Sequence, residues 1–336
     1  MKILVNCPLP FALAHGGHQI QIQRTLAALQ AVGVQTEPVR WWDENQTGDL
    51  IHYFGRMPVG HVKLAQQKGI KVIVGELLTE QGSRSNLQLR LQKIISNTIE
   101  RFAPSNFVFA FNWESYRIAD ACIALTPWEA HLMNCLFDAP RERVHVVANG
   151  VEEIFLNSPK AVRGQWLVCA ATITERKRVR ELAEAAIRAQ TPVWIVGGAY
   201  SESEPYAQKF SALARRHPQF VRHEGPVLDR AQLAQIYREA RGFVLLSNME
   251  SLSLSALEAA ACECPLLLSD LPWACSTFGN AAKYCPVTKS IEATAKVLRE
   301  FYDAAPSLPV PPKPASWNEI GRRLKQIYEK VLGLSR

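Results

Sequence analysis

Short apolar runs alternate with longer amphipathic stretches along the whole chain. Buried parallel strands form near-continuous apolar runs, whereas surface helices repeat apolar residues three and four positions apart. In the first half, strands are expected at residues 3–7, 35–41, 50–54, 72–76, 121–125 and 144–148. In the second half, strands are expected at residues 166–170, 193–196, 220–223, 243–246, 266–269 and 283–285. The main expected helices are residues 18–32, 62–67, 87–102, 128–137, 179–189, 206–215, 230–240 and 253–262.

Strand–helix alternation of this kind predicts an α/β fold with parallel sheets covered on both faces. The 336 residues suit two domains, and turn residues collect at Asn157-Ser158-Pro159 between the two sets of strands. We therefore predict two doubly wound Rossmann-like domains facing a cleft, residues 1–157 and 158–315. Residues 304–316 carry five prolines and form a crossover. The amphipathic helix that follows is expected to pack back on the first domain, which then also includes residues 316–336.

The apolar runs and the cysteine spacing indicate the cellular compartment. The chain begins directly with a strand and has no run of ~18 apolar residues, so we expect neither a signal peptide nor a membrane span. Its eight cysteines show no Cys-x-x-Cys pair, and Cys262 and Cys264 lack a second pair at metal-binding spacing. Reduced cysteines, no metal site and a cytoplasmic location are therefore expected.

The net charge of +7 is confined to the second half. Residues 1–157 hold 14 Lys/Arg and 14 Asp/Glu, which leaves 24 and 17 of the 38 and 31 for residues 158–336. A basic half favours an anionic ligand. Nucleic acid is excluded as a partner because the positive charges are dispersed and lack interleaved aromatic residues.

Two segments are candidate anion sites. The pair Gly16-Gly17 lies between a strand and a helix, where a backbone without side chains approaches a phosphate closely at the helix N-terminus; a flexible turn is the equal alternative. The pattern is not Gly-x-Gly-x-x-Gly, so a dinucleotide fingerprint is absent. The second segment, residues 174–180, opens a helix with the cations Arg176, Lys177, Arg178 and Arg180. Cations at a helix N-terminus are unfavourable unless an anion offsets them. The run therefore favours a phosphate site, and a solvated charged face is the alternative.

The third segment, residues 245–266, is the most specific. Glu250 precedes a helix and Glu258 lies within its apolar stretch, with Ser251 or Ser253 as the N-cap. At 1.5 Å rise per residue the two acids flank the helix N-terminus at separations on the order of 10 Å. Amides between them suit a diphosphate, and the carboxylates suit sugar hydroxyls. Two solvent-facing glutamates are the alternative.

This segment resembles the Glu-x7-Glu motif of retaining GT-B glycosyltransferases, family 4. The family motif, an acid-Gly-Phe-Gly stretch followed by Glu-Ala-Met-Ala-Cys-Gly-x-Pro, corresponds here to residues 250–253 and 258–265. Residues 147–151 are similar to the family's Asn-Gly-Val turn, and residues 225–237 to the loop and helix that border the nucleotide base. The glycines that follow the first acid and the cysteine in the family motif are replaced here.

The resemblance implies a role for each matching residue. Glu258 would bind the nucleotide ribose and Lys177 the donor diphosphate, with Gly16 and Gly17 in the first phosphate loop. Glu250, with the backbone of Ser251 and Leu252, would face the transferred sugar. The family's Gly-Arg before the lysine is Ala171-Thr172 here, which leaves Arg176 or Arg178 to replace the arginine.

The family's acceptor-side histidine is absent from residues 74–79. Glu76 is the candidate replacement, because it ends a strand whose carboxyl end faces the cleft. A strand-end glutamate turned to solvent is the alternative.

These inferences predict a glycosyltransferase that moves a hexosyl group from a nucleoside diphosphate sugar with retention. The partners are a nucleotide-sugar donor and a saccharide or lipid-linked acceptor, with no cofactor. No Asp-x-Asp occurs, so no catalytic metal is expected. A catalytically silent family member and a nucleotide-sugar epimerase remain alternatives.

A candidate peripheral contact with the inner membrane surface is formed by the apolar residues of 87–102 and 107–111, with Arg84, Arg90, Lys93 and Arg101 nearby. Ordinary packing of these segments is the alternative.

Overall fold

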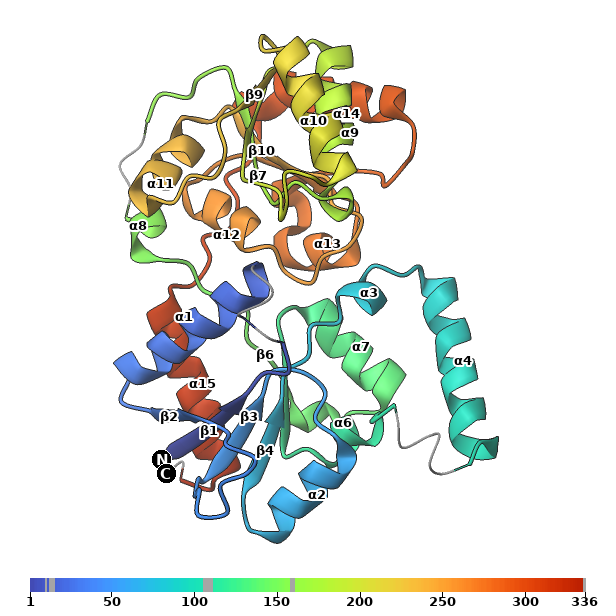
Figure 1. Ribbon diagram of the computed structural model, residues 1–336, viewed down its shortest axis with the longest axis vertical. Helices are drawn as coiled ribbons and strands as arrows, with labels where there is room; N and C mark the ends of the chain where they lie inside the picture. The colour runs from blue at the N-terminus through green and yellow to red at the C-terminus, as the bar shows by residue number, and fades with distance from the viewer. Residues whose placement is uncertain (10, 12–15, 105–110, 158–160, 335–336) are drawn as a thin grey trace. The chain divides into compact units, whose positions relative to one another are not determined.

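The computed structural model describes residues 1–9, 11, 16–104, 111–157 and 161–334. The chain forms two compact units. Unit 1 contains Met1–Gly150 and Trp317–Arg336, and unit 2 contains Val151–Ser316. Within the described residues each unit holds one six-stranded parallel sheet flanked by helices, so the predicted α/β fold class is confirmed (Figure 1).

The sheet of unit 1 has the strand order β2-β1-β3-β4-β5-β6. Its strands are β1 (Lys2–Asn6), β2 (Gln35–Pro38), β3 (Leu50–Tyr53), β4 (Lys71–Val74), β5 (Ala121–Ala124) and β6 (Val144–Val146). The strands β3 and β5 are buried throughout, because helices cover both faces. The order reverses between β1 and β3, where doubly wound sheets bind ligands beyond the carboxyl ends of the strands.

Two groups of helices cover this sheet (Figure 1). One group is α1 (Gly17–Ala31) and α15 (Trp317–Val331), which pack against each other. The contact is close, since a Cβ at Gly321 would lie 2.5 Å from the carbonyl oxygen of Ala28. The other group is α2 (Val59–Gln67), α6 (Glu114–Ile118) and α7 (Pro127–Phe137), with α3 (Thr79–Gly82) and α4 (Asn86–Phe102) beside α7. The C-terminal helix therefore returns to unit 1.

The segment 151–157 lies in unit 2, although we expected the boundary after Asn157. Val151 donates its amide to the carbonyl of Ala315 and forms a β-bridge with Ser316. The short helix α8 (Glu153–Leu156) packs on the helices of unit 2. Both connections between the units consequently leave unit 2 side by side.

The sheet of unit 2 has the strand order β12-β11-β10-β7-β8-β9. Its strands are β7 (Leu167–Ala170), β8 (Val193–Val196), β9 (Val221–His223), β10 (Gly242–Leu245), β11 (Leu266–Ser269) and β12 (Ala282–Cys285). Its longer helices are α9 (Val179–Ala189), α10 (Pro205–Arg216), α11 (Arg230–Glu239), α12 (Leu254–Ala261), α13 (Pro272–Phe278) and α14 (Ile291–Ala304). The order reverses between β7 and β10, so the loops after these two strands lie at the position where Rossmann folds bind ligands.

Candidate functional site

The two predicted motifs of unit 2 meet at the β7/β10 reversal. The segment after β7 forms a short 3-10 helix, Glu175–Lys177, and the segment after β10 leads into α12. Their backbones are joined directly, because the amide of Asn248 donates to the carbonyl of Arg176 at 2.8 Å. The Arg176 guanidinium in turn donates to the carbonyl of Met249 at 3.0 Å. Residues 174–180 and 245–266 thus form one site.

Glu250 is the acid at the centre of this site. One oxygen of its carboxylate accepts hydrogen bonds from Nη1 of Arg176, at 2.8 Å, and from the Lys177 ammonium. The side chains of Glu250 and Lys177 are only 10% and 12% exposed, so their attraction is weakly screened by water. Glu250 therefore supplies an anion that offsets part of the basic run.

The other two cations of the run point elsewhere. Arg178 is buried, and its guanidinium donates to the carbonyl of Thr288. Arg180 pairs with Glu181 at 3.1 Å and with Glu184 at 3.4 Å. Of the two arginines considered as replacements for the family arginine, Arg176 lies beside Lys177 at Glu250, whereas Arg178 secures a distant loop.

Glu258 lies in the second turn of α12, which begins after the N-cap Ser253. The residue is 8% exposed, as its apolar surroundings in the sequence suggest. Its carboxylate accepts a hydrogen bond from Arg230, which also binds Glu152 at 2.8 Å, and lies 3.4 Å from the hydroxyl of Tyr237. Burial raises the pKa of Glu258, and the Arg230 charge opposes that rise. The acid is held in place by a cation that the sequence did not single out.

The N-terminus of α12 lies between the two acids. Leu252 and Ser251, which connect Glu250 to the N-cap, are each 6% exposed. The first amides of a helix have no intrahelical acceptor, and together with the helix dipole they favour an anion. The arrangement therefore combines a basic pair, a helix N-terminus and two carboxylates within one unit.

Gly16 and Gly17 belong to unit 1 and begin α1. Gly16 has a φ of 154°, a conformation that L residues with side chains rarely adopt, and no side chain caps the helix. The residues 12–15 that precede this pair, including His15, lie outside the described residues. The N-terminal amides of α1 thus have no side-chain acceptor at the N-cap.

Glu76 follows β4 in unit 1. Its carboxylate accepts hydrogen bonds from Nε and Nη2 of Arg56, at 2.8 and 3.2 Å, and from the hydroxyl of Tyr116. The Arg56 guanidinium also lies 4.8 Å from the ring centroid of Phe137. Burial, assisted by the Glu76 charge, raises the pKa of Tyr116. Glu76 is therefore fixed by partners within the protein rather than turned to solvent.

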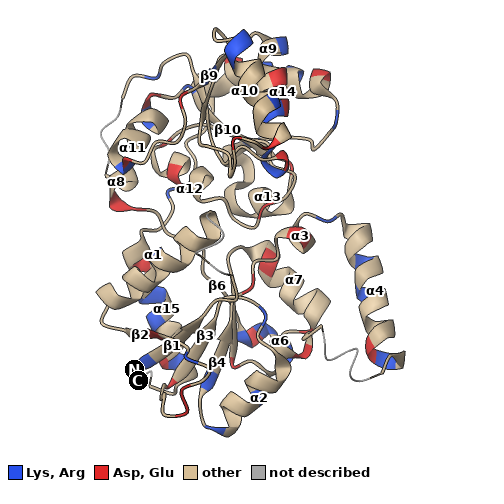
Figure 2. Ribbon diagram, in the orientation of Figure 1, with Lys and Arg blue, Asp and Glu red and all other residues tan. Residues whose placement is uncertain are grey.

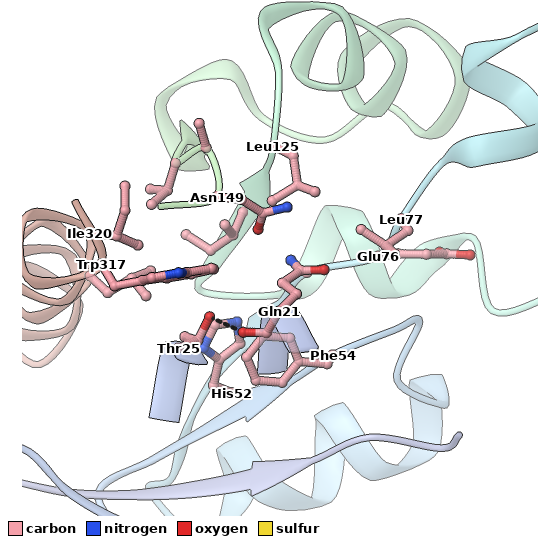
Figure 3. A pocket seen from close by; sticks show the side chains of 15 residues that line it. Gln21, Thr25, His52, Phe54, Glu76, Leu77, Leu125, Asn149, Trp317 and Ile320 are labelled. Atoms are coloured by element: carbon pink, nitrogen blue, oxygen red, sulfur yellow. Dashed lines mark hydrogen bonds between the residues drawn. The ribbon is translucent and has the colours of Figure 1, made fainter. Parts of the chain in front are cut away.

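A pocket with buried polar walls lies at the carboxyl ends of β3 to β6, and Glu76 contributes to its lining (Figure 3). Gln21, His52 and Asn149 line it and are less than 9% exposed. Nδ1 of His52 shares a 2.6 Å hydrogen bond with the Tyr328 hydroxyl, while Nε2 has no partner among the described residues. Burial lowers the pKa of His52 to about 3, so the imidazole is neutral near pH 7.

Sequence reasoning missed the residues that hold the acids in place: Arg230 for Glu258, with Glu152 behind it, and Arg56 and Tyr116 for Glu76. Arg230 lies in the segment that resembles the base-bordering helix, but nothing in its spacing marks it. A buried glutamate in an apolar helix requires a cation or a proton, and that requirement alone points to an unidentified partner.

Within the described residues, no group of three or more His, Cys, Asp or Glu side chains has the geometry to hold a metal ion. None of the described helices has the length and apolarity needed to cross a bilayer.

Similar solved structures share this architecture. A sucrose-phosphate synthase from Thermosynechococcus elongatus superposes with a TM-score of 0.67 at 18% identity, over 99% of this chain and 100% of that one. HepE of Anabaena, solved with UDP and glucose, gives a TM-score of 0.63 at 13% identity, over 99% and 98% of the two chains. At these identities the likeness establishes the fold, which is the two-domain GT-B arrangement.

A curated relative shares part of the sequence. The D-inositol 3-phosphate glycosyltransferase of Jonesia denitrificans is 32% identical over 177 residues, 45% of this chain and 41% of that protein. The chain thus aligns with less than half the length of this relative. The family described as "Glycosyl transferases group 1" matches residues 151–323, more than half of the chain, including both motifs around Glu250. The chain belongs to the group 1 glycosyltransferases.

Proposed function

We propose that this protein transfers a hexosyl group from a nucleoside diphosphate sugar to a saccharide or lipid-linked acceptor, with retention of configuration. The observation that carries the proposal is the pair of buried acids, Glu250 and Glu258, on either side of a helix N-terminus, with Lys177 paired to Glu250. The resemblance to family 4 motifs supports the retaining chemistry. That HepE was solved with UDP and glucose supports the donor class.

Each donor group has a complementary partner in unit 2. Lys177 and Arg176, with the first amides of α12, would bind the diphosphate. Glu258 would accept hydrogen bonds from the ribose hydroxyls, and Glu250, with the backbone of Ser251 and Leu252, would contact the transferred sugar. Lysine has three N–H donors, so Lys177 can keep its bond to Glu250 while it binds a phosphate oxygen. In unit 1, the amides that follow Gly16 and Gly17 are a second proposed phosphate contact.

In the proposed reaction, the bond between the anomeric carbon and the diphosphate oxygen breaks, and the acceptor hydroxyl oxygen bonds to that carbon. The acceptor proton leaves with the diphosphate. Negative charge grows on the leaving oxygens, where Lys177 and the helix amides stabilise it most. We propose that Lys177 and Arg176, with these amides, take the place that a divalent metal has in other sugar transferases.

The acceptor side is assigned to unit 1. Glu76 would orient an acceptor hydroxyl from its position at the pocket beyond β4. Its bonds to Arg56 and Tyr116 fix the carboxylate geometry and favour an orienting role. The alternative of a catalytically silent donor-binding protein remains, because Arg56 and Tyr116 already occupy most of the acceptor sites of the Glu76 carboxylate.

A panel of nucleoside diphosphates and their sugars tests the proposal. We expect one nucleoside diphosphate to raise the melting temperature strongly, because only a ligand of the folded state stabilises it. Its hexose conjugate should be hydrolysed slowly without acceptor and consumed faster with one. Binding without any turnover would indicate the silent protein, and an isomerised nucleotide sugar would indicate the epimerase. Lack of stabilisation by every nucleoside diphosphate would refute the donor site.

A further inference from the structure

The helix α4 exposes its apolar face to solvent. Five large apolar side chains on it are more than half exposed: Leu87 (68%), Leu91 (51%), Ile94 (61%), Ile95 (58%) and Phe102 (75%). The helix itself is well defined, since Ser85 and Gln88 form a capping box at its start. A surface helix ordinarily turns its apolar stripe to the core, so this orientation is reversed.

The side of α4 that meets the protein lies opposite this stripe. Leu89 and Ser96 are its buried residues, and Lys93 binds Asp138 and the carbonyl of Leu136 at the end of α7. At about 100° per residue, the exposed apolar residues centre roughly 180° from this buried line. The stripe is therefore not a by-product of packing on unit 1. A contiguous exposed apolar surface of this kind indicates a partner.

Figure 2 shows basic residues along α4 and an acidic one near its C-terminal end. At about 100° per residue, Arg90 and Arg101 fall at one border of the apolar stripe, and neither takes part in an ion pair within the described part of the chain. The one acid of the helix, Glu100, is bound by Arg117 at 3.1 Å. The Arg101 guanidinium lies 5.4 Å from the ring centroid of Phe102. Apolar and cationic groups consequently share one face.

We propose that α4 lies on the surface of a bilayer containing anionic lipids. Its apolar stripe enters the boundary between headgroups and acyl chains, and Arg90 and Arg101 bind lipid phosphates. A second copy of the chain is disfavoured as the occupant, because pairing two such stripes gathers four arginine charges, and the one acid on each copy of α4 is already bound by Arg117. This docking does not depend on the sugar-transfer reaction.

Sedimentation of the full-length protein with vesicles tests the proposal. We expect binding to phosphatidylcholine vesicles that contain phosphatidylglycerol, and much weaker binding to phosphatidylcholine alone. Leu91→Gln combined with Ile94→Gln should abolish binding without a fall in melting temperature, because both side chains are already exposed. Leu228→Gln, at an 85% exposed leucine of unit 2, is the matched control and should bind like the wild type.

The charge contribution is measured separately. Arg90→Gln combined with Arg101→Gln should lower the partition into anionic vesicles roughly tenfold or more, given about a fivefold contribution per surface cation. Lys209→Gln, at an exposed lysine of unit 2, should not. Absence of binding to anionic vesicles, or equal binding by the Leu91/Ile94 variant, would overturn the proposal. So would a dimer in solution that this variant dissociates, since the stripe would then contact a second copy.

Discussion

Lys177 and Glu250 lie 73 positions apart in the chain and form a hydrogen-bonded ion pair at the β7/β10 reversal. Arg176 binds the same carboxylate oxygen from the neighbouring position. The pair joins the basic run after β7 to the acid before α12, so the two strongest motifs of the sequence form a single electrostatic unit. Because Glu250 has two cationic partners, either cation can be removed without leaving a buried carboxylate unpaired.

Lys177→Ala should lower both kcat and kcat/KM for the donor. The lysine faces oxygens whose negative charge increases as the glycosidic bond breaks, so its loss affects the transition state more than the ground state. A charge-assisted hydrogen bond contributes about 1.5–3 kcal/mol, which corresponds to a roughly 10- to 150-fold loss in kcat/KM. Steady-state kinetics on a variant with an unchanged melting temperature measures the effect.

The basic run supplies the controls for Lys177. Arg180 pairs with Glu181 and Glu184, so Arg180→Ala should change the kinetics much less. Arg178→Ala should instead lower stability, by about 1–3 kcal/mol for the lost bond to the Thr288 carbonyl. Equal kinetic losses in Arg176, Lys177 and Arg180 variants would show that the run acts as a diffuse patch.

Glu258→Ala should mainly raise the donor KM. A ribose contact is made equally in the ground and transition states, so its loss removes uniform binding and leaves kcat nearly unchanged. Arg230 keeps its bond to Glu152 in this variant, which limits the damage to the fold. Calorimetry with the nucleoside diphosphate that stabilises the wild type gives the affinity directly. Unchanged affinity in the folded variant would contradict the assignment of Glu258.

Most of the strands could be predicted from the sequence because they are compact apolar runs between turn residues, although β2 is polar and has no buried residue. Leu266–Ser269 and Val193–Val196 are found where the pattern places them. The helix α14 was missed although its buried residues Ala295, Leu298 and Phe301 are spaced three apart. Its small and polar positions dilute the apolar period, and packing against α9 compensates for that weakness.

The site was predictable only as far as local motifs extend. Glu250, Glu258 and Lys177 were identified because they lie in recognisable segments. Their partners follow from strand order, which a linear pattern does not contain: Arg230 meets Glu258 across two helices, and Arg56 meets Glu76 across neighbouring strands. The basic run shows the same limit, because its spacing alone places four cations at one helix start. In the structure Arg176 and Lys177 bind Glu250, whereas Arg178 binds the Thr288 carbonyl and Arg180 binds acids of its own helix.

Activity should be indifferent to chelators. We propose that Lys177, Arg176 and the amides of α12 neutralise the leaving diphosphate, which is the task that a divalent metal would otherwise perform. Donor hydrolysis measured with and without EDTA should give the same rate. A complete loss that Mg²⁺ or Mn²⁺ restores would show that the proposed mechanism is wrong.

Glu76→Gln should reduce transfer to the acceptor while donor hydrolysis without acceptor stays the same. The amide keeps the size of the side chain but loses the charge that Arg56 and Tyr116 hold in place. Tyr116→Phe is the matched control for positioning, since it removes one bond to the carboxylate and keeps the charge. Full turnover of Glu76→Gln with the acceptor would exclude the residue from the acceptor side.

His52 should make unfolding depend on pH in mildly acidic solution. Burial lowers its pKa to about 3 in the fold, whereas an unfolded histidine has a pKa of about 6.5. Between these values the unfolded chain binds a proton that the folded chain does not, so the stabilisation is fully present above about pH 6.5 and is lost as the pH falls toward 3. The slope from this residue is at most about 1.4 kcal/mol per pH unit.

Urea denaturation of the wild type and of His52→Gln at about pH 7 and about pH 5 isolates the contribution of His52. The difference in unfolding free energy between the two proteins should shrink or reverse at the lower pH. His61→Gln, at an exposed position of α2, should leave the pH dependence of the wild type intact. A constant difference between wild type and His52→Gln across this range would mean that the imidazole gains its proton in the fold as readily as in the unfolded chain, which requires water to reach its unpaired Nε2 through the pocket.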